Sequence, residues 1–182
     1  DVAEGAAFTE FNPFDHVVTP FEIPIGWERT KGIDYGYASE SACVWGTVDP
    51  SDGTLIIYRE LYRKGLLGTE LGSMLTEMEY EDPFSVPGVL DTACWSKTGT
   101  TGPTVGETLQ RAGHKLRRAD KNQSIPLDKT KPEDVDTHAS DHAYDALRYL
   151  IMGRPRINDT INQLRQFRRE SHFTPSDSTF GY

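Results

Sequence analysis

The segment from Lys31 to Leu61, KGIDYGYASESACVWGTVDPSDGTLIIYREL, decides the fold of this chain of 182 residues. It contains three runs rich in β-branched and aromatic residues, and the pair Asp52-Gly53 stands between the second run and the third. Such residues favour extended backbone, and Asp-Gly between two such runs is a hairpin signal. The segment therefore predicts three consecutive antiparallel strands.

Helical and extended patterns alternate after the three strands. Apolar residues first recur at helical spacing, and later the pattern T-x-x-E at Thr104 is a capping box that opens a helix, which stops at Gly113. The further elements predicted are a helix over 69–79, a strand that ends at Asp91, the helix from Thr104, a strand over 114–119 and a helix over about 138–151. The order β-β-β-α-β-α-β-α is typical of an α/β fold, with a mixed sheet whose faces are covered by helices.

The composition divides the chain into three parts. Residues 1–25 contain three prolines among scattered aromatic residues, which predicts an extended lead-in. Residues 26–155 hold the elements described above and form the predicted domain. An amphipathic stretch and a polar end follow, so we expect a C-terminal helix and a mobile tail over 156–182.

The overall composition limits the possible functions. The chain has a formal net charge of −9, and no apolar run approaches the roughly 18 residues that span a bilayer, so we expect no membrane contact. The acidic balance argues against a protein that coats nucleic acid through its overall charge. It does not exclude a nuclease, because carboxylates that gather metal ions make a site acidic. Cys43 and Cys94 fit no metal or redox spacing, and we interpret them as reduced thiols of a cytosolic protein.

Acidic residues stand where regular elements can direct them to one place. Asp34 lies in the first strand and Asp91 ends a later strand, and ligands in such sheets collect beyond the carboxyl ends of strands. The last helix carries Asp141 and Asp145 one turn apart, with His142 between them. Structural roles remain open for each: a turn contact for Asp34, a helix-dipole contact for Asp141, and an i,i+3 pair with Arg148 for Asp145. On a helical wheel the inward face consists of Ala143, Ala146, Leu147, Leu150 and Ile151.

Five stretches carry a longer pattern. They are HVVTPFEIPIGWERTKG at 16–32, IDYGYASESACVWG at 33–46, GVLDTACW at 88–95, KPEDVDT at 131–137 and DHAYDALRY at 141–149. Together they resemble the nuclease domain of the large terminase subunit of tailed bacteriophages, from about Gly5 to Gly153. The resemblance implies a ribonuclease H-like fold, whose element order agrees with the order derived above. It also makes the lead-in the continuation of an upstream ATPase domain.

The resemblance implies a DNA endonuclease that cuts concatemeric viral DNA during packaging, by two-metal-ion hydrolysis of the phosphodiester. Asp34, Asp91 and Asp145 would be the metal ligands, with Asp141 as an extra ligand of the second ion. His142 would lie beside the metals, where it could bind a metal, shuttle a proton or hold Asp145. Two Mg²⁺ or Mn²⁺ ions suit such a site, because these hard cations prefer oxygen ligands.

The resemblance also implies partners. Double-stranded DNA would be the substrate, and the candidate contacts to its phosphates are Lys97, Arg117, Arg118 and Lys121, for which solvated surface is the alternative. The packaging ATPase of the same polypeptide, the portal and the small terminase subunit would be protein partners. The protein would act in the host cell cytoplasm as part of the packaging motor, and not in the mature virion.

Two departures from the family and two other functions qualify this interpretation. The passage from 118 to 137 is short, since relatives carry an extra segment with a strand there. No G-x-x-x-x-G-K-[ST] loop occurs, so we expect the nuclease part without its ATPase. Another ribonuclease H-like nuclease, such as a junction resolvase or a transposase core, would share the acidic site and differ in substrate. A non-catalytic interaction domain would use the same acidic residues as helix caps and surface pairs.

Overall fold

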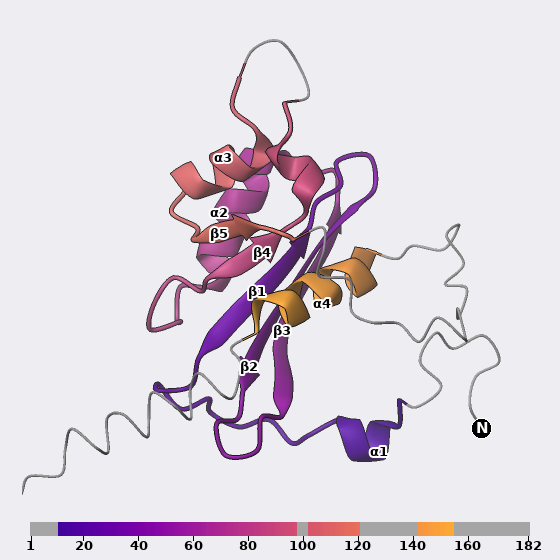
Figure 1. Cartoon of the computed structure of the whole chain (residues 1–182), viewed down its shortest axis with the longest axis vertical. Helices are drawn as coiled ribbons and strands as arrows, with labels where there is room; N and C mark the ends of the chain where they lie inside the picture. Colours follow the sequence, from indigo (N-terminus) through magenta and orange to yellow (C-terminus); the bar gives the residue numbers. More distant parts are fainter. Residues whose placement is uncertain (1–10, 98–101, 121–141, 155–182) are drawn as a thin grey trace, which may run out of the picture.

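A five-stranded mixed sheet forms the centre of the computed structural model, which describes residues 11–97, 102–120 and 142–154 (Figure 1). The strands lie in the order β3-β2-β1-β4-β5. The elements are α1 (Pro13–His16), β1 (Arg29–Asp34), β2 (Glu40–Val48), β3 (Leu55–Lys64), α2 (Gly68–Met78), β4 (Gly88–Leu90), the 3-10 helix η1 (Thr92–Trp95), α3 (Val105–Arg111), β5 (Leu116–Arg118) and α4 (His142–Gly153).

The pairing of the strands confirms the predicted ribonuclease H-like mixed sheet. Strands β1, β2 and β3 pair antiparallel in chain order, whereas β4 pairs parallel to β1 and β5 parallel to β4. The predicted hairpin joins β2 to β3: the amide of Asp49 donates to the carbonyl of Thr54 at 2.9 Å. Gly53 in this turn has a φ of 85°, which glycine adopts without steric strain.

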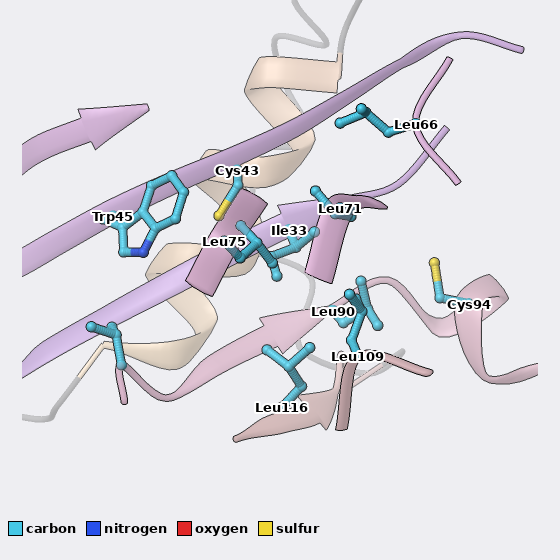
Figure 2. Close-up of a cluster of buried hydrophobic side chains, with 11 residues drawn as sticks. Ile33, Cys43, Trp45, Leu66, Leu71, Leu75, Leu90, Cys94, Leu109 and Leu116 are labelled. Carbon is cyan, nitrogen blue, oxygen red and sulfur yellow. The ribbon is translucent and has the colours of Figure 1, made fainter. Parts of the chain in front are cut away.

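Helices cover both faces of the sheet. On one face, Ile33 of β1 and Trp45 of β2 belong to a buried cluster that includes Leu71 and Leu75 of α2 and Leu109 of α3 (Figure 2). The opposite face carries α4, and the side chains that form this second, smaller cluster are Ala42, Val44, Ala146 and Leu150. Two layers of helix thus enclose the central strands, as the alternation of elements along the chain predicts.

The sequence signals for helix ends agree with the structure. The hydroxyl of Thr104 accepts a hydrogen bond from the amide of Glu107 at 3.1 Å, and the carboxylate of Glu107 accepts one from the amide of Thr104 at 2.8 Å. This is the predicted capping box, and Gly113 beyond the end of α3 has a φ of 98°. The helix predicted over 69–79 is α2, shifted by one residue.

A charged group is buried between the sheet and α2. The side chain of Lys31 is 0% exposed and forms an ion pair with Glu79, whose Oε1 also accepts a hydrogen bond from Nε1 of Trp45 at 2.8 Å. Nδ1 of His114 lies 3.2 Å from Nζ of Lys31, and its Nε2 lies 2.9 Å from the carbonyl of Gly72. Burial lowers the pKa of His114. A neutral ring that donates at Nε2 and accepts from the lysine at Nδ1 satisfies both contacts.

Helix α4 lies directly against β1, because β1 has no side chain at the crossing point. A Cβ atom built on Gly32 would lie 2.0 Å from the carbonyl oxygen of Ala146 and 2.2 Å from the amide nitrogen of Leu150. Both are main-chain atoms of α4. Glycine is therefore required here for the close approach of a helix, and this approach places the first turns of α4 beside the end of β1.

Three features differ from the sequence-based expectations. The residues after Asp91 form η1, which was not predicted, and α1 interrupts the lead-in. Ala143, expected on the inward face of α4, is exposed, whereas Tyr149 is buried. Ala143 lies in the first turn of α4, which stands at the carboxyl end of β1, where the sheet no longer covers the helix. Ala146 lies one turn later and packs against the sheet.

Several predictions concern residues outside the described ranges, namely those for the metal ligand Asp141, the DNA contact Lys121, and the C-terminal helix and tail over 156–182. Within the described ranges, no helix combines the length and the apolar character that crossing a membrane requires.

Candidate active site

Two aspartates meet at the carboxyl ends of neighbouring parallel strands. Asp34 is the last residue of β1, and Asp91 directly follows β4. The strands are in register, with Ile33 opposite Leu90, and the amide of Asp91 donates to the carbonyl of Ile33 at 3.2 Å. The two carboxylates therefore start from adjacent backbone positions, as the positions of Asp34 and Asp91 in the sequence predict.

Helix α4 reaches both strand ends. Nδ1 of His142, in its first turn, lies 2.7 Å from Oδ2 of Asp34. Two turns later, the hydroxyl of Tyr149 donates a hydrogen bond to Oδ1 of Asp91 at 3.0 Å. Asp145 lies between these residues on the helix. The structure thus brings together side chains from the end of β1, from the residue after β4 and from α4, at the carboxyl ends of the parallel strands.

Two expectations about α4 need correction or refinement. Among the roles considered for His142 was that of holding Asp145, but the structure pairs this histidine with Asp34, and its Nε2 lies 3.9 Å from a carboxylate oxygen of Glu40. Asp145 forms the i,i+3 ion pair with Arg148, at 2.8 Å, that was the structural alternative for this residue. A surface pair of this kind is worth about 1 kcal/mol or less, which is small beside the attraction of a divalent cation for a carboxylate.

Two neighbouring carboxylates act on Asp34. Burial is the main cause that raises the pKa of Asp34, the negative charges of Asp145 and Asp91 raise it further, and the contact with His142 lowers it. Burial and the charges of Asp91 and Asp34 likewise raise the pKa of the Cys94 thiol to about 12. Negative charge is therefore concentrated at this edge, which favours a bound cation and keeps the neighbouring thiol protonated.

The type of ligand fits divalent cations, but the described side chains do not form a closed cage. Carboxylate oxygens are the donors that Mg²⁺ and Mn²⁺ prefer. Within the described ranges, no group of three or more His, Cys, Asp or Glu side chains is spaced to hold one ion. The carboxylate of Asp145 is directed to Arg148, and the further predicted ligand, Asp141, belongs to a part of the chain that is not described. The site therefore fits a divalent cation by the type of its ligand atoms and by its negative charge.

The predicted DNA contacts separate in space. Arg118 ends β5 opposite Leu90, so it lies at the same sheet edge as Asp91, with its guanidinium 6.0 Å from the ring centroid of Trp95. Arg117 points the other way and donates to the carbonyl of Met152 at 2.7 Å. Lys97 is exposed, and its charge helps to lower the pKa of Glu107, after the hydrogen bonds with Thr104 and the charge of Arg111.

A cavity of about 690 Å³ opens at the opposite end of the sheet. Its lining comes from the amino ends of β1, β4 and β5 and from the end of α4, and includes Glu28, Phe84, Lys115, Arg117 and Gly153. Asp34, Asp91 and Asp145 do not line it. The candidate site is therefore the open surface at the carboxyl ends of β1 and β4, and not this cavity.

Sequence reasoning missed Tyr149, Gly32 and Glu40 as parts of the site. A signal existed for Tyr149, which follows His142 by seven residues and Asp145 by four, and so lies on the same side of a helix. For Glu40, which starts β2, and for Gly32, only the pairing of distant elements reveals the role.

Comparisons with known proteins support the fold. The chain matches no protein-family model and no curated protein. Among solved structures, the nuclease domain of the phage P22 large terminase aligns with 96% of this chain and 73% of its own chain, at 14% identity and a TM-score of 0.50. The large terminase of a thermophilic bacteriophage, in its second crystal form, aligns with 67% of this chain, at 18% identity and a TM-score of 0.50. The complex of the same terminase with ADP aligns with 62%, at 16% identity and a TM-score of 0.50.

The coverage is unequal for the two phage proteins. The aligned region spans only 29% and 27% of the two chains from the thermophilic phage, but nearly three quarters of the isolated P22 domain. At these identities the likeness concerns the fold. The chain therefore has the ribonuclease H-like α/β fold of the nuclease domains of phage large terminases.

Proposed function

We propose that this chain is a metal-dependent DNA endonuclease domain, which cuts concatemeric viral DNA during genome packaging. One observation carries the proposal: carboxylates from β1, β4 and α4 gather at the carboxyl edge of a sheet with the terminase nuclease fold. The charges of Asp145 and Asp91 add to burial in raising the pKa of Asp34, and this accumulation of negative charge supports a site for cations.

In the proposed mechanism, Asp34, Asp91 and Asp145 hold two divalent cations, with Asp141 as the further ligand. When bound, Mg²⁺ or Mn²⁺ lowers the pKa of a water molecule and offsets negative charge that develops on the phosphate. No side chain has to act as the nucleophile, which agrees with the neutral, buried thiol of Cys94.

We assign His142 to the orientation of Asp34, or to the movement of a proton at its Nδ1 and Nε2 atoms. Its ring lies between the carboxylates of Asp34 and Glu40, at 2.7 and 3.9 Å. A histidine that lies between two acids can take up a proton at one nitrogen and release it from the other. Glu40 begins β2 and is partly exposed, so its carboxylate lies near Nε2 without a direct hydrogen bond to it.

The proposed substrate and partners follow from the fold. Double-stranded DNA would lie across the carboxyl ends of the strands, with Arg118 beside it and with Lys97 and Lys121 as further candidate phosphate contacts. The aligned region corresponds to less than a third of the large terminase from the thermophilic phage. We therefore infer an ATPase domain upstream of residues 1–25 in the same polypeptide, and a portal and a small terminase subunit as partners in the host cell cytoplasm.

A plasmid-cleavage assay tests the proposal. Supercoiled DNA is incubated with the protein and Mn²⁺ or Mg²⁺, with a chelator, and with the variants Asp91→Asn and Glu77→Gln. Glu77 is exposed on α2 and remote from the site, so Glu77→Gln controls for the loss of one carboxylate. We expect nicked and linear products only with metal, a loss of at least about 100-fold in Asp91→Asn, and wild-type rates in Glu77→Gln. Cleavage that persists in the chelator or in Asp91→Asn would contradict the metal mechanism.

The same preparation separates the two other functions considered. A junction resolvase would cut a four-way DNA junction much faster than a linear duplex of equal length. A non-catalytic interaction domain would cut neither DNA and would bind no Mn²⁺. A terminase nuclease is expected to cut linear duplex with little sequence preference.

A further inference from the structure

Tyr149 connects α4 to one of the strand carboxylates. Its side chain is 6% exposed and packs with Val89 of β4 and Ala119, next to β5, in a small buried cluster. The ring is thus fixed by packing against the sheet. Its hydroxyl emerges at the sheet edge and donates to Oδ1 of Asp91 at 3.0 Å.

The hydrogen bonds on Asp91 favour one orientation of its carboxylate. The hydroxyl of Thr92, in the next residue of the chain, lies 3.3 Å from the same Oδ1 atom. Both bonds therefore fall on one oxygen, and within the described residues none is found on Oδ2. A carboxylate held by one oxygen presents the other as a ligand.

A third residue links this pair to Asp145. The guanidinium of Arg148 lies 5.2 Å from the ring centroid of Tyr149, and its Nη2 lies 3.4 Å from the hydroxyl. The same nitrogen is 2.8 Å from Oδ1 of Asp145. One continuous set of contacts therefore runs from the carboxylate of α4 to the carboxylate that follows β4.

We propose that Tyr149 is a positioning residue, whose hydroxyl holds Oδ1 of Asp91 and so leaves Oδ2 available as the atom that would bind a divalent cation. The inference rests on the proposed metal-dependent function. With His142 bound to Asp34, it makes α4 the element that sets the geometry of both strand carboxylates. Partners that orient metal ligands typically change metal affinity by roughly 10- to 100-fold when they are removed.

The first experiment measures Mn²⁺ binding by isothermal titration and by electron paramagnetic resonance, without DNA. The variant Tyr149→Phe keeps the packed ring and removes only the hydroxyl. Tyr80→Phe is the matched control, since Tyr80 is 88% exposed. We expect the Kd for Mn²⁺ to rise roughly 10- to 100-fold in Tyr149→Phe, with little change in Tm, and to stay unchanged in Tyr80→Phe. An unchanged Kd in Tyr149→Phe overturns the inference, and so does a fall in Tm with no change in Kd.

A double-mutant cycle shows whether the hydroxyl acts through Asp91. In the Asp91→Asn background, Tyr149→Phe should have no further effect on the remaining Mn²⁺ affinity. An equal loss in both backgrounds would mean that Tyr149 acts elsewhere. The wild-type titration separates this inference from the function on which it rests. If the wild-type protein binds no Mn²⁺, the proposed function fails; if it binds and Tyr149→Phe binds equally well, only the role of Tyr149 fails.

Discussion

A single methyl group added at Gly32 should separate α4 from the sheet and disable the site. The Cβ of Gly32→Ala would lie 2.0 Å from the carbonyl oxygen of Ala146, and ordinary contact begins at 3.4 Å, so α4 must retreat by about 1.4 Å. The opposing atoms belong to the main chain, so no change of rotamer relieves the overlap. Overpacking of this kind costs about 1–3 kcal/mol, and a strained crossing of two backbones lies at the upper end.

The displacement predicts two measurable effects. A destabilisation of about 3 kcal/mol lowers Tm by roughly 6–12 °C in a domain of this size. Since α4 carries His142, Asp145 and Tyr149, a shift of about 1 Å should also lower the rate of plasmid cleavage by about 100-fold at a temperature where the variant is fully folded. Differential scanning calorimetry and the cleavage assay measure the two effects separately.

Gly26→Ala is the matched control, because no atom lies within 4 Å of a Cβ built at that position. It should retain the Tm and the cleavage rate of the wild-type protein. If Gly32→Ala behaves like Gly26→Ala in both assays, α4 does not depend on contact with the bare backbone of β1, and the reasoning is refuted. A lower Tm with an unchanged cleavage rate would refute the link between the crossing and the site.

Three further predictions concern the core. Lys31→Met leaves the buried carboxylate of Glu79 unpaired and should cost about 3–5 kcal/mol in denaturant unfolding, whereas adding Glu79→Gln should recover most of the loss; no recovery would contradict a buried ion pair. Burial lowers the folded pKa of His114 below its ordinary value of 6.5, so the unfolded chain binds more protons and stability should fall as the pH drops below about 6.5. Tm measured between pH 7 and pH 5.5 should show this slope, and His114→Gln should flatten it; equal slopes would exclude His114 as the cause. Thr104→Ala removes the cap of α3 and should cost about 1 kcal/mol in the same unfolding assay, and a neutral result would mean that the cap contributes nothing.

Much of the architecture could be predicted because it depends on interactions between residues that are close in the sequence. The three antiparallel strands follow from β-branched and aromatic runs and from one Asp-Gly turn, and the start of α3 follows from a capping box over four residues. The convergence of Asp34 and Asp91 was also predictable, because the carboxyl ends of neighbouring parallel strands meet at one edge. Each of these signals acts within one element or follows from a general rule of sheet topology.

The sequence by itself thus determined the order of the five strands and of the helices between and after them, the start of α3 and the strand ends that carry acid. Only the tertiary structure decided which side chains contact one another there. His142 meets Asp34 across 108 positions of the chain, and Tyr149 meets Asp91 across 58. These contacts depend on the distance between α4 and β1 and on the rotation of α4 about its axis. The absence of a side chain at Gly32 permits the short distance, and the packing of α4 against the sheet fixes the rotation. Periodicity tells which face of a helix is apolar, but it holds no information on the distance between that helix and a strand more than a hundred residues away.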